Sequence, residues 1–124
     1  MTSDLFSKIQ AGAVALRDRI DERRPRAAFV LGSALGGFAD RVEGAISVPY
    51  NDVPHVRTPT AAGHAGRFVS GTVEGLEVLV LSGRLHYYEG YALEDVTFPI
   101  RLVAALGVEI IVLTNASGGV DPSF

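Results

Sequence analysis

The sequence contains no cysteine, and its other absences also narrow the class of protein it encodes. Without cysteine there is no disulfide framework and no thiolate metal site. No apolar run reaches the roughly 18 residues that a membrane-spanning helix needs, and the first ten residues, MTSDLFSKIQ, lack the apolar segment of a signal peptide. These absences fit a cytoplasmic protein, and we expect that location.

Basic residues are also few, and the net charge is −3. This charge argues against general nucleic-acid binding, which depends on a clustered basic surface that contacts phosphates. Lys8 is the lone lysine among the 11 basic residues, and the others are arginines. Any recognition of phosphate or carboxylate must therefore rest on guanidinium groups, which present planar forks of N–H donors.

Length and hydrophobic content predict a globular chain. With 124 residues, 48% of them hydrophobic, the chain can bury a sizeable core. There is no repeat, no low-complexity segment and no clear linker. We expect residues 1–124 to form a single domain, or part of one, without an internal boundary.

The spacing of apolar residues predicts two helices. Residues 5–20 carry an apolar side chain every three or four positions, which is typical of one face of an amphipathic helix. A second helix is expected from about residue 94 to 106. Pro99 predicts a kink or a late start in this helix, and Gly107 is expected to end it.

Four short apolar runs are predicted as strands: residues 27–31, 67–73, 76–82 and 108–114. The second and third runs are separated by Glu74 and Gly75, which predicts a hairpin. Residues 51–66 contain two prolines and show no apolar period, so we interpret them as a long loop. Long ordered loops in compact domains are usually functional or mobile.

Three of the predicted strands run directly into polar, glycine-containing turns: GSALGG (32–37), GRLHYYEGY (83–91) and NASGG (115–119). Ligands in open α/β sheets gather at the carboxyl ends of strands, where such turns expose backbone N–H groups. We expect the three turns to line one pocket. Taken alone, GSALGG is either a tight turn or an anion nest with the Ser33 hydroxyl. NASGG alone favours a structural role, in which Gly118 and Gly119 permit positive φ angles after the strand.

The turn GRLHYYEGY carries the strongest chemical signal. Arg84 and His86 are two residues apart, so both project to one face if strand geometry persists. A guanidinium binds phosphate through two parallel N–H donors, and an imidazole adds a donor or titrates near neutral pH. Glu89 is close enough in sequence to orient the imidazole. The structural alternative is a surface ion pair of Arg84 with Glu89 or Glu94.

The remaining histidines are ambiguous. His64 is framed by two glycines in the long loop and is either part of the anion site or a solvated loop residue. His55 is interpreted as structural. A zinc site is not expected, because His55 and His64 lack the i,i+4 spacing of a helical ligand pair and no acidic ligand motif accompanies them.

The ordered series LGSALGG, GHAGR, GRLHYYEGY, TFPIR and TNASGG resembles the N-terminal half of the purine nucleoside phosphorylase family, in its trimeric class that cleaves inosine and guanosine. The resemblance runs from about Phe29 to Phe124. It implies an α/β fold with a mixed central β-sheet flanked by helices, of which this chain covers roughly the N-terminal half. It also implies phosphorolysis of purine ribonucleosides to the free base and ribose 1-phosphate, without a metal or organic cofactor, by a homotrimer when full length.

The resemblance also implies roles for the matching positions. Phosphate would be held by the following groups: Ser33, His64, Arg84, His86 and the backbone of Ala116. Of these, His86 would be the catalytic residue, and Glu89 would orient its imidazole. Tyr88 would contact the ribose. The purine would be bordered by Asn115, Ala116, Ser117 and Gly118.

Two departures from the family pattern bear on these expectations. The family usually has glycine at the position of Ala34, where a Cβ restricts φ and crowds an anion. Family members are also about twice as long, and the missing half supplies the acidic residue and the asparagine that hold the purine. The alternative is therefore a truncated, non-catalytic module that binds anions or a partner protein. Inosine, guanosine and xanthosine stay open as substrates.

Overall fold

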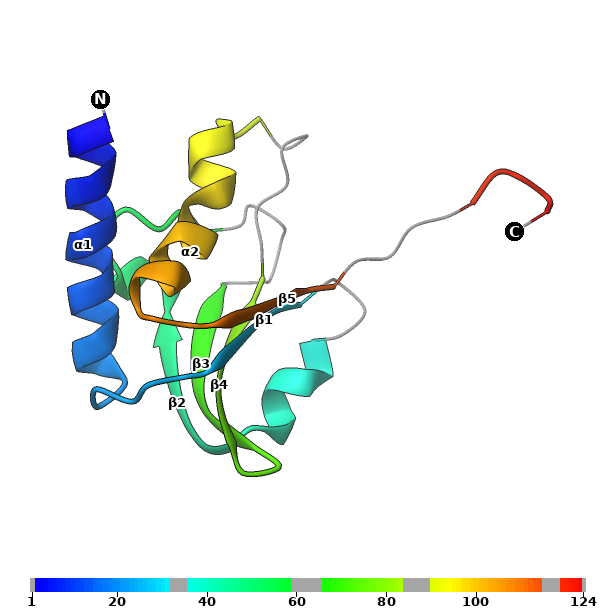
Figure 1. Ribbon diagram of the computed structural model, residues 1–124, viewed down its shortest axis with the longest axis horizontal. Helices are drawn as coiled ribbons and strands as arrows, with labels where there is room; N and C mark the ends of the chain where they lie inside the picture. Colours follow the sequence, from blue (N-terminus) through cyan, green and yellow to red (C-terminus); the bar gives the residue numbers. More distant parts are fainter. Residues whose placement is uncertain (1, 32–35, 59–65, 84–89, 115–118, 124) are drawn as a thin grey trace.

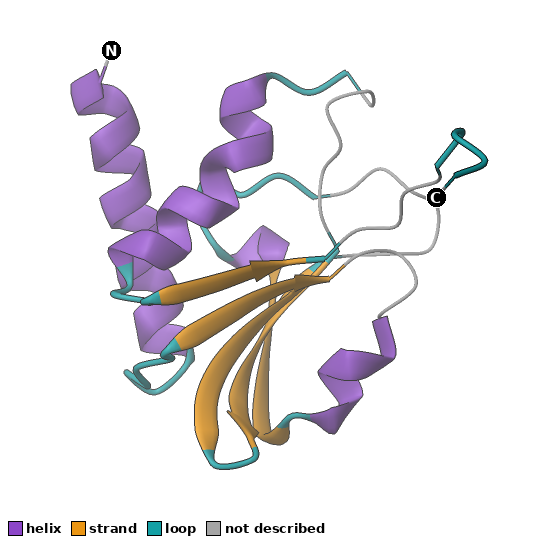
Figure 2. Cartoon of the chain, turned by 45° about the vertical axis from the view of Figure 1, so that its right-hand side comes forward, coloured by secondary structure: helices purple, strands orange, loops and turns teal. Residues whose placement is uncertain are grey.

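The structure is a computed structural model that describes residues 2–31, 36–58, 66–83, 90–114 and 119–123. Its centre is a five-stranded mixed sheet in the order β2-β3-β4-β1-β5. The strands are β1 (Ala27–Leu31), β2 (Glu43–Pro49), β3 (Arg67–Val73), β4 (Leu76–Ser82) and β5 (Ile110–Leu113). Helices α1 (Thr2–Arg19) and α2 (Leu93–Ala105) lie side by side on one face of this sheet (Figures 1 and 2). The expected mixed sheet flanked by helices is confirmed.

The sheet buries side chains on both faces. The helix-covered face forms a cluster with α1 and α2 that contains these strand residues: Ala28, Val30, Val48, Phe68, Leu79 and Leu81. The opposite face packs Val69, Val78 and Val80 against Ala39 of the 3₁₀ helix η1 (Gly36–Arg41). Successive strand residues point to opposite faces, so the apolar runs in β1, β3 and β4 supply both clusters.

Helix α1 confirms the prediction from apolar spacing. Leu16 and Ile20 are fully buried, and Leu5 and Ile9 pack against the same cluster. Asp4 lies in the first turn, and two arginines lie in the last turn. This distribution of charge complements the helix dipole. None of the helices in the described part of the chain is long and apolar enough to cross a membrane.

Helix α2 begins at Leu93 and contains Pro99 in its interior, so the alternative of a late start is wrong. Its end confirms the role predicted for Gly107. This glycine has a φ of 89°, and the amide of Val108 donates to the carbonyl oxygen of Val103 at 3.4 Å. The amide of Gly107 donates to Ala104 at 3.0 Å, which completes a glycine-dependent helix stop.

The predicted hairpin is confirmed between β3 and β4, with Val73 opposite Leu76. Glu74 and Gly75 have φ angles of 52° and 79°, as the two-residue turn requires. Strand β2 and helix η1 were not predicted. Strand β2 is exposed at every residue except Ile46 and the buried Val48, and its pairing with β3 is irregular between Glu43 and Ile46. It therefore lacks the apolar alternation by which a strand is recognised.

Candidate active site

The carboxyl ends of three strands meet at one edge of the sheet. Strands β4 and β5 both run parallel to β1, so Leu31 lies opposite Ser82 and Val30 lies opposite Leu113. The three glycine-containing turns of the sequence follow these strand ends directly. The register thus supports the expectation that the turns leave the sheet at a common edge.

The long loop returns to the same edge. Strand β3 runs antiparallel to β4, and its first residue, Arg67, is opposite Ser82. The preceding residue, Gly66, accepts a hydrogen bond from the amide of Tyr50 at 3.0 Å. The segment that contains His64 therefore ends beside the strand that leads to Arg84.

The predicted site residues themselves lie outside the described residues: Ser33, Ala34, His64, Arg84, His86, Tyr88, Glu89, Asn115, Ala116, Ser117 and Gly118. Their roles stay predictions. The structure places the residues that flank them, and these flanking residues carry several specific contacts.

Tyr50 contacts two of these flanking residues and is itself buried, at 2% exposure. Its hydroxyl donates to the carbonyl oxygen of Gly83 at 2.5 Å, and its ring packs edge-on against Phe68 with 4.8 Å between ring centroids. Burial raises the pKa of Tyr50 well above its ordinary value, so the hydroxyl keeps its proton and acts as a donor. Sequence reasoning missed this residue because β2, which Tyr50 follows, was not recognised.

Two further hydroxyls donate to backbone carbonyls at the same edge. The Tyr91 hydroxyl donates to the carbonyl oxygen of Thr58 at 3.1 Å, which joins the residue after Gly90 to the middle of the long loop. The Thr114 hydroxyl donates to Val30 at 2.7 Å, and the Thr114 amide donates to the same oxygen at 3.1 Å. These bonds fix the chain where it enters the predicted purine segment.

The described part of the long loop is also held by charged side chains. Arg19 of α1 pairs with Asp52 at 2.7 Å, and Arg57 pairs with Asp95 of α2 at 3.6 Å. Exposed pairs of this kind add little stability. They do connect the loop to both helices.

His55 lies in the same loop, exposed to solvent, with its ring edge-on to Phe98 at 6.4 Å between centroids. This contact agrees with the structural role expected for it. Among the residues that the structure describes, no group of three or more histidine, cysteine, aspartate or glutamate side chains is placed to hold a metal ion.

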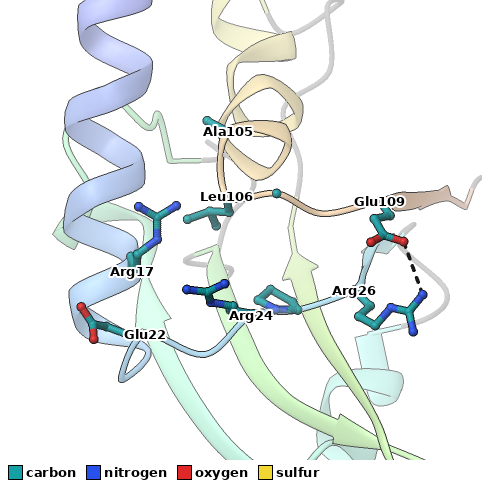
Figure 3. Close-up of a pocket in the computed structure, with 9 residues that line it drawn as sticks. Arg17, Glu22, Arg24, Arg26, Ala105, Leu106 and Glu109 are labelled. Carbon is teal, nitrogen blue, oxygen red and sulfur yellow. Dashed lines mark hydrogen bonds and ion pairs between the residues drawn. The ribbon is translucent and has the colours of Figure 1, made fainter.

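A groove of about 670 Å³ opens at the other edge of the sheet, near the start of β1 (Figure 3). Arg17, Arg24 and Leu106 lie around it, from the end of α1, the loop before β1 and the end of α2. Arg26 and Glu109 form an exposed ion pair of 3.3 Å beside it. The described residues that line this groove belong to none of the motifs that carry chemistry, so we take the opposite edge as the candidate active site.

An α/β sheet with glycine-containing loops at the carboxyl ends of its parallel strands defines a class of small-ligand-binding proteins. The chain belongs to the Phosphorylase superfamily, whose family model matches residues 26–124. The resemblance to purine nucleoside phosphorylases is thereby confirmed.

Relatives and solved structures agree on this family. The chain is 52% identical to purine nucleoside phosphorylase 1 of Geobacillus stearothermophilus over 100 residues, covering 81% of this chain and 36% of the relative. It is 44% identical to purine nucleoside phosphorylase 1 of Bacillus subtilis over 117 residues, covering 94% of this chain and 43% of the relative. The Schistosoma mansoni purine nucleoside phosphorylase in complex with inosine superposes with a TM-score of 0.86 at 34% identity, covering 94% of this chain and 40% of that one. The chain thus spans less than half the length of these relatives.

Proposed function

We propose that the chain carries the phosphate-binding part of an enzyme that cleaves purine ribonucleosides of the inosine and guanosine type by phosphorolysis. The observation that carries the proposal is the strand register, which brings the ends of β1, β4 and β5 and the start of β3 to one edge. Four of the five motifs of the resemblance overlap the segments next to these ends, and the fifth, TFPIR, lies in α2. The solved relative bound to inosine supports a purine nucleoside as the substrate, and the same relative is also solved with adenosine.

The proposed reaction is a displacement at the anomeric carbon of the ribose. The bond between that carbon and the purine nitrogen breaks, and its electron pair leaves with the base, which takes up a proton. A phosphate oxygen forms the new bond with inversion, which gives ribose 1-phosphate. The sugar carries positive charge in the transition state, so a fixed phosphate dianion stabilises it before attacking.

The phosphate ligands in this proposal are Ser33, His64, Arg84, His86 and the Ala116 amide. Arg84 supplies a bidentate fork, and His86 adds a donor whose protonation is sensitive to pH near neutrality. Preorganised donors of this kind typically contribute about 3 kcal/mol each to the transition state. Tyr88 contacts the ribose, and residues 115–118 border the purine. Neither a metal nor an organic cofactor takes part.

The second candidate function is a non-catalytic anion-binding module of the same fold, and the chain spans less than half the length of these relatives. In the family, the carboxylate and asparagine that hold the purine come from a part of the sequence that has no counterpart here. The full enzyme of this proposal is a cytoplasmic homotrimer in which the remainder of the fold supplies these groups.

One pair of measurements on the purified chain tests the proposal. Isothermal titration with inorganic phosphate reports the anion site, and incubation with inosine and phosphate followed by a hypoxanthine assay reports turnover. Phosphate binding without turnover supports the phosphate-binding part and the second candidate. Turnover that depends on phosphate supports a complete enzyme, whereas no phosphate binding refutes the assignment of the site.

A further inference from the structure

Two tyrosines connect the two segments proposed to carry the phosphate ligands, and they do so at opposite ends. Tyr50 contacts the end of one segment and the start of the other: its amide donates to Gly66 at 3.0 Å, and its hydroxyl donates to Gly83 at 2.5 Å. Residues 59–65 lie immediately before Gly66, and residues 84–89 follow Gly83 directly. One residue therefore fixes where the His64 segment ends and where the Arg84 segment begins.

Tyr91 makes the complementary connection. Its hydroxyl donates to the carbonyl oxygen of Thr58 at 3.1 Å. Thr58 directly precedes residues 59–65, and Tyr91 follows the 84–89 segment after a single glycine. The hydroxyl of Thr58 donates in turn to the side-chain oxygen of Asn51 at 2.9 Å, one residue from Tyr50. Both ends of both segments are thus joined across the edge of the sheet.

The Tyr50 contact also determines a direction. The carbonyl that it holds belongs to Gly83, whose φ of 102° turns the chain out of β4. The peptide unit that begins at Gly83 is planar, so holding its carbonyl oxygen restrains the direction in which the chain leaves β4. The ring that carries the hydroxyl is itself buried against Phe68 in the core. The core of the fold therefore restrains the chain at Gly83.

We propose that Tyr50 and Tyr91 are positioning residues that hold the His64 segment and the Arg84–His86 segment at the separation at which both reach one phosphate. The inference rests on the proposed function. Tyr50 lies outside the motifs that suggested that function, and Tyr91, the last residue of GRLHYYEGY, was given no role in it. Pre-ordered loops lower the entropy lost on binding, so releasing either connection weakens phosphate binding.

Tyrosine-to-phenylalanine substitutions separate positioning from packing, because they remove the hydroxyl and keep the ring. We expect Tyr50→Phe and Tyr91→Phe each to weaken phosphate binding about fivefold to tenfold, as the loss of one hydrogen bond allows. The urea midpoint of unfolding should fall by no more than the loss of one hydrogen bond allows. Val78→Ala is the control, because Val78 is buried on the opposite face of the sheet near the start of β4. It should lower the urea midpoint and leave phosphate affinity close to that of the unsubstituted chain.

The double substitution tests whether the two tyrosines act together. If both connections are needed to hold the segments, releasing one removes most of the benefit of the other. The loss in the double variant should then be smaller than the product of the two single losses. A full product would show that the two hydroxyls act separately and would overturn the joint role.

The possible failures are distinguishable. If the unsubstituted chain binds phosphate and Tyr50→Phe and Tyr91→Phe bind it equally well, the positioning role is wrong and the proposed function stands. If the unsubstituted chain binds no phosphate, the proposed function fails and this inference fails with it. If Tyr50→Phe does not fold, the phosphate affinity of Tyr91→Phe tests the positioning role, because Tyr91 is half-buried and lies outside the core.

Discussion

Gly71 of β3 offers a sharp test of the packing between β2 and β3. A Cβ built on this residue would lie inside van der Waals contact of the Glu43 carbonyl oxygen and the Val42 side chain, and at 3.4 Å from the Ala45 Cα. The first of these obstacles is backbone, which no change of rotamer can move. Gly71→Ala must therefore push β2 away from β3 at the irregular stretch of their pairing.

Overpacking of this kind typically costs about 1–3 kcal/mol, and we expect the upper end because the obstacle is backbone. For a chain of this length, about 3 kcal/mol lowers the melting temperature by roughly 10 °C. Thermal unfolding followed by circular dichroism measures the change. The matched control is Gly37→Ala, because a Cβ on Gly37 has nothing within 4 Å. A Gly71→Ala chain that melts together with the unsubstituted chain would refute the packing of β2 against β3 argued above.

Three further predictions concern the site and the sheet edge. Arg84→Lys should weaken phosphate binding at least tenfold in the same titration, since it keeps the charge and loses the bidentate fork. Arg24→Lys, at the opposite edge, should leave phosphate binding unchanged. Equal effects of the two substitutions would show that Arg84 is not a phosphate ligand. The chain with inosine and phosphate should release no hypoxanthine above a host-enzyme blank, and turnover like that of a full-length relative would contradict this. The chain should self-associate in sedimentation velocity, and Leu113→Lys should reduce this because a charge on an edge strand opposes pairing; unchanged association would place the contact elsewhere.

Local sequence signals predicted the elements whose side chains meet the core regularly. Helix α1 was predictable because Leu16, Ile20 and their neighbours repeat at helical spacing and pack on one face. The hairpin was predictable because two apolar runs flank Glu74 and Gly75, which both adopt positive φ angles. In these elements, the local sequence pattern and the tertiary packing favour the same structure.

The elements that were missed or altered depend on contacts that sequence spacing does not encode. Strand β2 is held by pairing with β3 while most of its side chains face solvent. Strand β5 was predicted over residues 108–114 and is shorter, Ile110–Leu113, because Val108 and Gly107 belong to the stop of α2. Tertiary pairing and a helix end decide these limits, so propensity alone could not.

The sequence predicted where the candidate site is expected, but it did not predict the hydrogen bonds that hold the chain around it. The rule that ligands gather at the carboxyl ends of parallel strands pointed to the edge where β1, β4 and β5 end. The connections made by Tyr50 and Tyr91 join residues 33 positions apart. A hydrogen bond between a side chain and a distant backbone carbonyl leaves no periodic signal, so only the folded chain reveals it.

The same topology explains why phosphate binding and the lack of turnover are expected together. Tyr50, Tyr91 and Thr114 hold the chain next to the segments proposed to bind phosphate and purine, and their contacts are all made within this chain. Strand β5 is the last strand in the sheet order, so only one of its sides is paired among the described strands. Its side chains Ile110 and Leu113 are exposed at 52% and 60%. The groups that stabilise a departing purine act only if they are fixed beside it, because water would otherwise have to reorganise around the developing charge. Under the proposed function these groups come from the remainder of the fold, so we expect this chain to bind phosphate without releasing the purine.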